Sequence, residues 1–125
     1  MLDLIIKNGQ CYINGELKDV DVSVKDGKIQ SIGKITDEAK DIIDAKGLIV
    51  LPGCIDTQTH FREPGSTDTE DLHTGSRAAI VGGITSVFEM PNTNPATTNQ
   101  KEFQRKIDLA KNRMFCNHAF YFGAT

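Results

Sequence analysis

The sequence has little of what marks several broad protein classes. Its three cysteines, Cys11, Cys54 and Cys116, are odd in number and lack C-x-x-C spacing, so they indicate neither a disulfide framework nor a thiolate metal site. Lys and Arg are scattered and the formal net charge is −3, which excludes a basic surface for a nucleic-acid partner. No apolar stretch is long enough to span a membrane, and Asp3 interrupts a signal-peptide pattern. We therefore expect a cytoplasmic protein without membrane association.

The composition is that of a globular protein. Of its 125 residues, 38% are hydrophobic and 25% are charged, which excludes disorder and low complexity. This length suffices for one ordinary domain but is about half of the roughly 250 residues that a closed (β/α)₈ barrel needs. Any barrel read from this sequence is therefore expected to be incomplete.

Residues 1–51 are built from short apolar runs separated by turn signals. The runs end at Asn8-Gly9, Asn14-Gly15 and Asp26-Gly27. Asn-Gly and Asp-Gly favour the positive φ angles and the twist of two-residue hairpins. We therefore predict an antiparallel, sandwich-like β module over residues 1–51, with no helix before residue 52.

After Pro52-Gly53 the pattern changes to alternating strands and helices. A capping box formed by Thr67 and Glu70 predicts a helix that runs to Val81, and Thr98 or Asn99 caps a second helix. Strands are predicted over residues 54–60, 84–90 and 115–122. A β-α-β-α-β order with right-handed crossovers requires a parallel sheet, so residues 52–125 are predicted to be an α/β unit. Its third strand is left as an open edge, which indicates either a truncated product or a second polypeptide that completes the sheet.

The most informative stretch is residues 52–65, which read PGCIDTQTHFREPG. Because side chains two apart in a strand point to the same side, Asp56, Gln58 and His60 are expected to share one face. His60 is nearest the C-terminal end of its strand, where functional side chains collect in parallel α/β barrels. His60 is therefore a candidate metal ligand.

Two segments together resemble a known family. Residues 52–65 resemble the P-G-x-I-D-x-H-x-H-x-R-E-P-G signature of class I dihydroorotases, in the amidohydrolase superfamily. Residues 82–95, GGITSVFEMPNTNP, resemble a second segment of the same family in the expected order. The resemblance covers essentially the whole chain. It implies that residues 52–125 are the first three strands and two helices of an amidohydrolase TIM-type barrel. Hydantoinases and allantoinases share the barrel, but the combination of motifs favours dihydroorotase, and Arg62 argues against allantoinase.

The resemblance also implies roles for four residues. In the family two zinc ions lie in the barrel mouth, and a His-x-His pair holds one of them; His60 matches the second member of that pair. Gln58 occupies the first position, and its neutral amide is a poorer zinc ligand than imidazole. Arg62 matches the residue that clamps the substrate carboxylate, and Asn92 matches a second substrate-binding position.

Each of these residues also has an ordinary structural interpretation. Arg62 can form a surface salt bridge with Glu63 or Asp68, and Asn92 can stabilise a turn. For three further polar residues we assign no function: His73 is predicted to be solvated, His118 to be a packed barrel residue, and Glu89 has no family role.

The resemblance implies reversible, zinc-dependent hydrolysis of dihydroorotate to N-carbamoyl-aspartate in pyrimidine biosynthesis. The remaining zinc ligands and the general base would lie beyond residue 125, so no catalytic residue is assigned and the isolated chain is expected to be inactive. Two alternatives stay open. Another chain completes a split enzyme, or the chain is a non-catalytic partner of aspartate transcarbamoylase.

Overall fold

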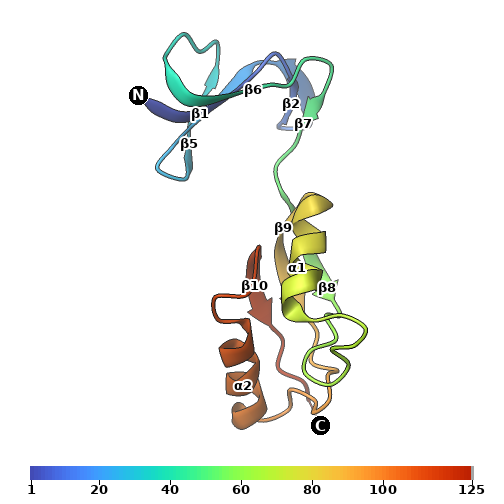
Figure 1. The fold of residues 1–125 in the computed structure, drawn as a ribbon. Helices are drawn as coiled ribbons and strands as arrows, with labels where there is room; N and C mark the ends of the chain where they lie inside the picture. The colour runs from blue at the N-terminus through green and yellow to red at the C-terminus, as the bar shows by residue number, and fades with distance from the viewer. Residues whose placement is uncertain (125) are drawn as a thin grey trace. The chain divides into compact units, whose positions relative to one another are not determined.

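A computed structural model describes residues 1–124 of the chain. By their internal packing the residues divide into two compact units, Met1–Pro52 and Gly53–Thr125 (Figure 1). Within the described residues, neither helix is long and apolar enough to cross a membrane. The fold class is the one expected: an α/β protein with a β-rich first part, followed by three parallel strands that two helices connect.

The first unit contains two sheets. A four-stranded sheet has the order β5-β4-β1-β6, and a three-stranded sheet has the order β3-β2-β7. The strands of this unit are β1 (Leu2–Lys7), β2 (Gln10–Ile13), β3 (Glu16–Asp19), β4 (Asp21–Lys25), β5 (Lys28–Gly33), β6 (Ala39–Asp44) and β7 (Ile49–Val50). Strand β3 was missed because all four of its residues are exposed, so it carries no apolar alternation.

Two of the predicted hairpins are confirmed. Asn14-Gly15 joins β2 to β3, and Asp26-Gly27 joins β4 to β5; all four residues have positive φ. Asn8 also has positive φ, but it lies between β1 and β2, which belong to different sheets. The unit is not purely antiparallel as predicted. Strands β6 and β7 pair in parallel with β1 and β2, because the chain crosses to the far edge of each sheet instead of turning back.

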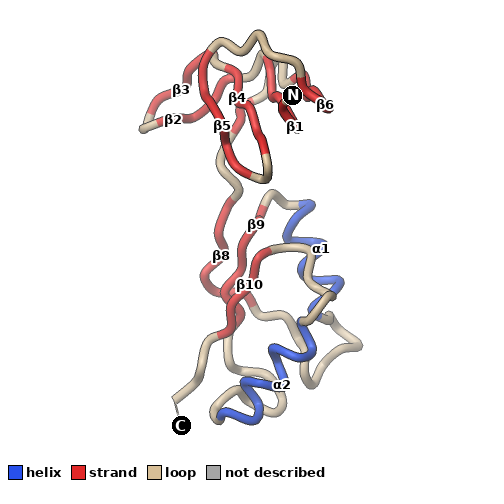
Figure 2. The backbone as a smooth tube through the Cα atoms, turned by 90° about the vertical axis from the view of Figure 1, so that its left-hand side faces the viewer, coloured by secondary structure: helices blue, strands red, loops and turns tan. Residues whose placement is uncertain are grey.

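The second unit is a parallel sheet with both helices on one side, as Figure 2 shows. Strands β8 (Cys54–Thr59), β9 (Ile84–Glu89) and β10 (Asn117–Phe120) lie in the order β10-β9-β8. Helices α1 (Leu72–Val81) and α2 (Gln100–Ala110) connect them. The buried core between sheet and helices consists of Phe61, Leu72, Val87, Ala110 and Cys116.

The two helix starts differ in how well the sequence predicted them. Asn99 caps α2, accepting a hydrogen bond from the Glu102 amide at 3.0 Å. Helix α1 begins later than predicted, because its capping box is formed by Asp71 and Thr74. The amide of Glu70 instead donates to the Ser66 carbonyl oxygen in a turn. The predicted Thr67 box therefore lies in a loop.

Strand β8 contains an irregularity that the sequence pattern did not show. Asp56 pairs with Val87 and Thr59 pairs with Glu89, so three steps along β8 match two along β9. Such a bulge interrupts the alternation of side chains. The Asp56 carboxylate accepts a hydrogen bond from the Gln58 amide at 2.9 Å within this segment. The prediction that Asp56, Gln58 and His60 share one face assumed unbroken alternation, which this register shift interrupts between Asp56 and Thr59.

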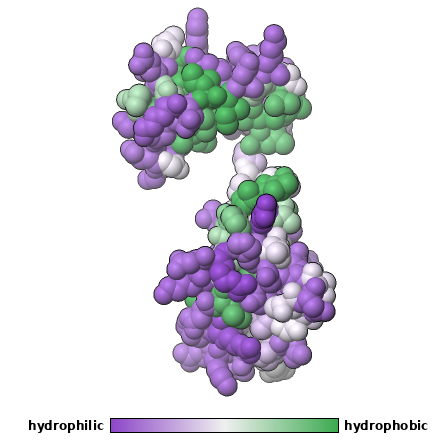
Figure 3. Space-filling model, viewed as in Figure 1, coloured by the Kyte–Doolittle hydropathy of each residue, from purple (hydrophilic) through white to green (hydrophobic). Residues whose placement is uncertain are grey.

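Apolar side chains are exposed in both units (Figure 3). In the first unit they include Ile29, Ile42 and Leu48. In the second unit Ile55 is 61% exposed, and it lines a shallow hollow with Phe88. These residues are part of the apolar surface that is exposed to solvent in the described residues.

Candidate functional site

A small pocket lies where the loops after β8 and β9 meet. Its volume is about 120 Å³, and it is lined by His60, Phe61, Arg62, Pro64, Ser66, Asn92, Thr93 and Asn94. The carboxyl ends of parallel strands lie at one edge of a sheet, so these two loops are neighbours. The pocket brings together three of the four residues singled out in the sequence.

Close contact between the two loops fixes the pocket wall. The Asn94 amide donates to the Pro64 carbonyl oxygen at 3.0 Å. A Cβ atom at Gly65 would lie 2.8 Å from both the Cβ and the carbonyl oxygen of Asn94, and Gly65 has a φ of +121°. Only glycine fits such a conformation and spacing without displacement. Gly65 is thus required for the two loops to approach.

His60 and Asn92 are hydrogen-bonded to each other. His60 Nδ1 lies 2.9 Å from Asn92 Oδ1. Because an amide oxygen only accepts, Nδ1 carries the proton, and the lone pair of the neutral ring lies on Nε2. Asn92 therefore fixes the tautomer and orientation of His60, as a second partner does for many metal-binding histidines.

Arg62 lines the pocket with an exposed side chain. Within residues 1–124 it has no ion-pair partner, so the salt bridge with Glu63 or Asp68 weighed from the sequence is not formed. A guanidinium group without a protein carboxylate is available for an external anion.

The carboxylate of Glu63 is directed away from Arg62 and into the protein. The Glu63 side chain is buried, and Arg113 donates hydrogen bonds to both of its oxygens. Nη1 lies 2.8 Å from Oε1, and Nη2 lies 3.0 Å from Oε2. Oε2 also accepts a hydrogen bond from the amide of Leu72, the first residue of α1, at 2.9 Å. Hydrogen bonding to Glu63 raises the pKa of Arg113. The pair joins the loop after β8 to both helices.

A second buried ion pair lies beneath the pocket, between Glu89 and Lys106. Both side chains are fully buried. Burial raises the pKa of Glu89 to about 7, although contact with Lys106 and the charge of Arg62 act in the opposite direction. Lys106 Nζ also donates to the Met90 carbonyl oxygen at 2.8 Å. This pair fastens α2 to the end of β9, one residue before the pocket loop begins.

Gln58 is exposed on β8 and does not line the pocket. Among residues 1–124, no three His, Cys, Asp or Glu side chains are grouped so that they hold a metal ion. Zinc sites use three or four protein ligands. His60 alone does not satisfy that requirement, so the described residues do not by themselves fit a zinc ion.

Comparison with known proteins identifies the family. The model of the amidohydrolase family matches residues 49–123, which is more than half of the chain. The chain belongs to the amidohydrolase family. The superfamily expected from the two motifs is thereby confirmed.

Relatives of this amidohydrolase are named for two related activities. Allantoinase of Escherichia coli O1:K1 is 49% identical over 113 residues, 90% of this chain and 25% of that protein. Allantoinase of Salmonella choleraesuis is 48% identical over the same shares. L-hydantoinase from Arthrobacter aurescens has a TM-score of 0.88 at 35% identity, covering 98% of this chain and 28% of that one. The chain thus spans about a quarter of the length of these relatives, and they do not specifically support the narrower resemblance to dihydroorotases.

The sequence carried a signal for Lys106 that its interpretation missed. Phe103, Ile107 and Ala110 recur at the helical period on α2, but Lys106 is fully buried and Ile107 is 39% exposed. Lys106 is three residues after Phe103 and four before Ala110, so it also satisfies the helical period. A lysine on the apolar face of α2 in this amidohydrolase therefore indicated a buried acidic partner, which is Glu89.

The two remaining histidines lie outside the pocket. His73 is exposed but is not simply solvated, because its ring packs against Phe115 at 4.9 Å and Nδ1 lies 3.3 Å from the Arg113 carbonyl oxygen. His118 was predicted to be packed, and it is exposed beside Phe120, with the two ring centroids 5.5 Å apart. The hollow that His118 lines is open to solvent.

Proposed function

We propose that this amidohydrolase acts on a cyclic amide whose ring carries a carboxylate. The observation that supports this is the pairing, in one pocket, of an Arg62 guanidinium without an ion-pair partner and a His60 ring with a free Nε2. Guanidinium binds carboxylate through two parallel hydrogen bonds, which would orient the ring beside the imidazole. Dihydroorotate, the substrate implied by the motifs, has this chemistry.

Each pocket residue has a separate task in this proposal. Arg62 holds the carboxylate of the substrate, and the loop contact between Gly65 and Asn94 keeps Arg62 at a fixed place beside His60. Asn92 uses its oxygen to hold His60 Nδ1, which leaves its amide hydrogens as donors. His60 Nε2 is then directed to accept a proton or to ligate a metal ion.

Zinc dependence is also part of the proposal, because the family resemblance implies it. The pocket supplies one imidazole, that of His60, so further ligands would have to come from polypeptide outside these 125 residues. For this reason we propose that the isolated chain does not turn over dihydroorotate. Release of N-carbamoyl-aspartate above background, in the presence of zinc, would contradict this.

Allantoin is the second candidate substrate, favoured by the 49% identity to allantoinase. The two candidates differ in charge, because dihydroorotate carries a carboxylate and allantoin does not. A carboxylate anchor is therefore useful only for the first. The role of Arg62 decides between them.

A binding experiment tests the choice without requiring turnover. The chain would be titrated with N-carbamoyl-aspartate and with allantoin while the NMR signals of Arg62 and His60 are followed. We expect N-carbamoyl-aspartate to bind and Arg62→Gln to weaken it by roughly tenfold or more. Arg77→Gln, which removes an exposed arginine on α1, is the matched control. Equal binding of allantoin that is insensitive to Arg62 would favour allantoinase chemistry instead.

A second polypeptide that completes the sheet is a further proposal. The exposed Ile55 and the neighbouring Phe88 on one sheet face support it, because they form an apolar hollow in the second unit. Co-expression with a polypeptide carrying the remaining strands, followed by co-purification, would test whether the two associate.

A further inference from the structure

The loop after β8 carries two adjacent residues of opposite charge, Arg62 and Glu63. Arg62 is followed directly by Glu63, so a carboxylate that is able to neutralise the guanidinium is one residue away. Opposite charges this close attract strongly outside bulk water. Within residues 1–124 the two nevertheless form no ion pair. Another group therefore has to bind the Glu63 carboxylate and keep it away from Arg62.

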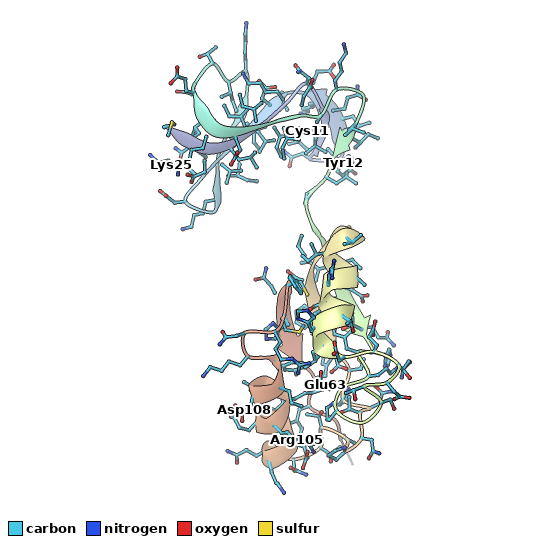
Figure 4. The ribbon with its side chains drawn as sticks, in the orientation of Figure 1. Cys11, Tyr12, Lys25, Glu63, Arg105 and Asp108 are labelled. Atoms are coloured by element: carbon cyan, nitrogen blue, oxygen red, sulfur yellow. The ribbon has the colours of Figure 1, made fainter. Side chains whose placement is uncertain are left out.

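Arg113 holds it. The guanidinium of Arg113 meets both oxygens of Glu63 in a bidentate pair, and it also donates to the Leu109 carbonyl oxygen at 3.0 Å. Asp71 Oδ2 lies 3.7 Å from Nη2, the nitrogen that also donates to Glu63 Oε2. Arg113 is 50 residues from Glu63 in the sequence, and only the packing of α2 brings them together. In Figure 4 Glu63 lies in the second unit, where α2 carries the labelled Arg105.

A second buried carboxylate that the charge of Arg62 influences, that of Glu89, is also paired with a cation. Glu89 lies close enough for the charge of Arg62 to influence it, and it is paired with Lys106. Lys106 belongs to α2, and Arg113 lies in the turn that follows this helix. Helix α2 and the turn after it therefore supply one cation to each of these two buried carboxylates, and the positive charge of Arg62 has no carboxylate partner among the described residues.

We propose that Arg113 is a positioning residue for the pocket: by holding both oxygens of Glu63, it keeps the Arg62 guanidinium available for the carboxylate of a bound ligand. The inference rests on the proposed role of Arg62 as the ligand anchor. It adds that this role depends on a residue that does not line the pocket.

The test compares variants of the full chain in their affinity for succinate, a small dicarboxylate, and for N-carbamoyl-aspartate. Arg113→Gln frees the Glu63 carboxylate, and we expect it to weaken succinate binding by roughly tenfold. Glu63→Gln/Arg113→Gln removes the competing charge as well, and we expect affinity within about threefold of the unmodified chain. Arg113→Lys keeps the cation and is expected to retain most of the binding. Arg105→Gln removes an exposed charge of α2 and controls for net charge.

The double variant separates positioning from a purely structural role. If Arg113 only held the fold together, the affinity of each variant would follow its folded fraction, measured by circular dichroism. Weaker succinate binding by folded Arg113→Gln, with recovery in the double variant, supports the positioning role, and a double variant as weak as Arg113→Gln overturns the proposal. If Arg113→Gln fails to fold, as judged by circular dichroism, the double variant decides alone. A folded double variant with near-normal affinity supports the proposal, and one that binds more than about tenfold more weakly overturns it.

The two ligands distinguish this inference from the proposed function. Succinate binding that depends on Arg113, without binding of N-carbamoyl-aspartate, supports the positioning role and contradicts the proposed substrate. Binding of N-carbamoyl-aspartate that does not change when Arg113 is replaced supports the proposed substrate and contradicts the positioning role. A chain that binds neither ligand contradicts both.

Discussion

Replacing Lys106 by Met should destabilise the second unit in a pH-dependent way. The substitution keeps an unbranched chain but removes the partner of a carboxylate that is fully buried. Leaving one member of a buried ion pair without the other costs about 3–5 kcal/mol. We expect a loss of this size in the free energy of unfolding at about pH 8.5, where Glu89 of the unmodified chain, with a pKa of about 7, has lost its proton.

The pH dependence follows from the pKa of Glu89, which burial raises to about 7 from an ordinary value of 4.5. Between these values the folded state binds more protons than the unfolded state, so the stability of the unmodified chain falls as pH rises through this window. Without Lys106 the pKa of Glu89 rises further, and the fall extends to higher pH. At about pH 5 Glu89 is protonated in both proteins, and we expect Lys106→Met to cost less than about 1 kcal/mol.

Urea unfolding followed by the helical circular dichroism signal is a suitable assay, because α1 and α2 both belong to the second unit. Lys101→Met, at an exposed position of α2, is the control and should change stability by less than about 0.5 kcal/mol. Glu89→Gln/Lys106→Met should recover most of the loss at high pH. An equal loss at both pH values for Lys106→Met would refute the reasoning.

Three further predictions concern individual residues. Asp71→Ala removes the cap of α1 and should lower the midpoint of thermal unfolding; because hydrogen bonding to Thr74 lowers the pKa of Asp71, this effect should fade as pH falls below about 4. Gly75→Ala should destabilise by about 1–3 kcal/mol in urea, because its Cβ would lie 2.5 Å from the Phe61 ring; a stabilised variant would contradict this packing. Gln58→His adds an imidazole at an exposed position that does not line the pocket, so zinc affinity measured by calorimetry should change by less than about threefold; a tenfold gain would show that position 58 and His60 share the ion.

Local sequence signals predicted much of this fold because they depend on neighbouring residues alone. Asn14-Gly15 and Asp26-Gly27 form the expected turns, and Asn99 caps α2, since each needs only a few adjacent dihedral angles and hydrogen bonds. The order of strands and helices after Pro52 was likewise readable. It correctly implied a parallel sheet, and the loops after β8 and β9 line a pocket.

The sequence could not predict features that depend on distant partners. The start of α1 is set by Asp71 rather than Thr67, in a loop where Glu63 binds the Leu72 amide. Strand β6 pairs in parallel with β1 because the chain after β5 crosses to the opposite edge of the sheet. These outcomes are decided by packing between segments, and no short stretch of sequence contains that information.

The sequence by itself determined the family, through two motifs in the right order, and identified His60, Arg62 and Asn92 as candidates for the site. Only the tertiary structure decided how these residues are supported. It placed Arg113 against Glu63 across 50 residues of chain, which leaves Arg62 without a protein carboxylate. Motifs persist as local patterns, whereas the distribution of charge around a pocket depends on which distant side chains the packed helices bring to it.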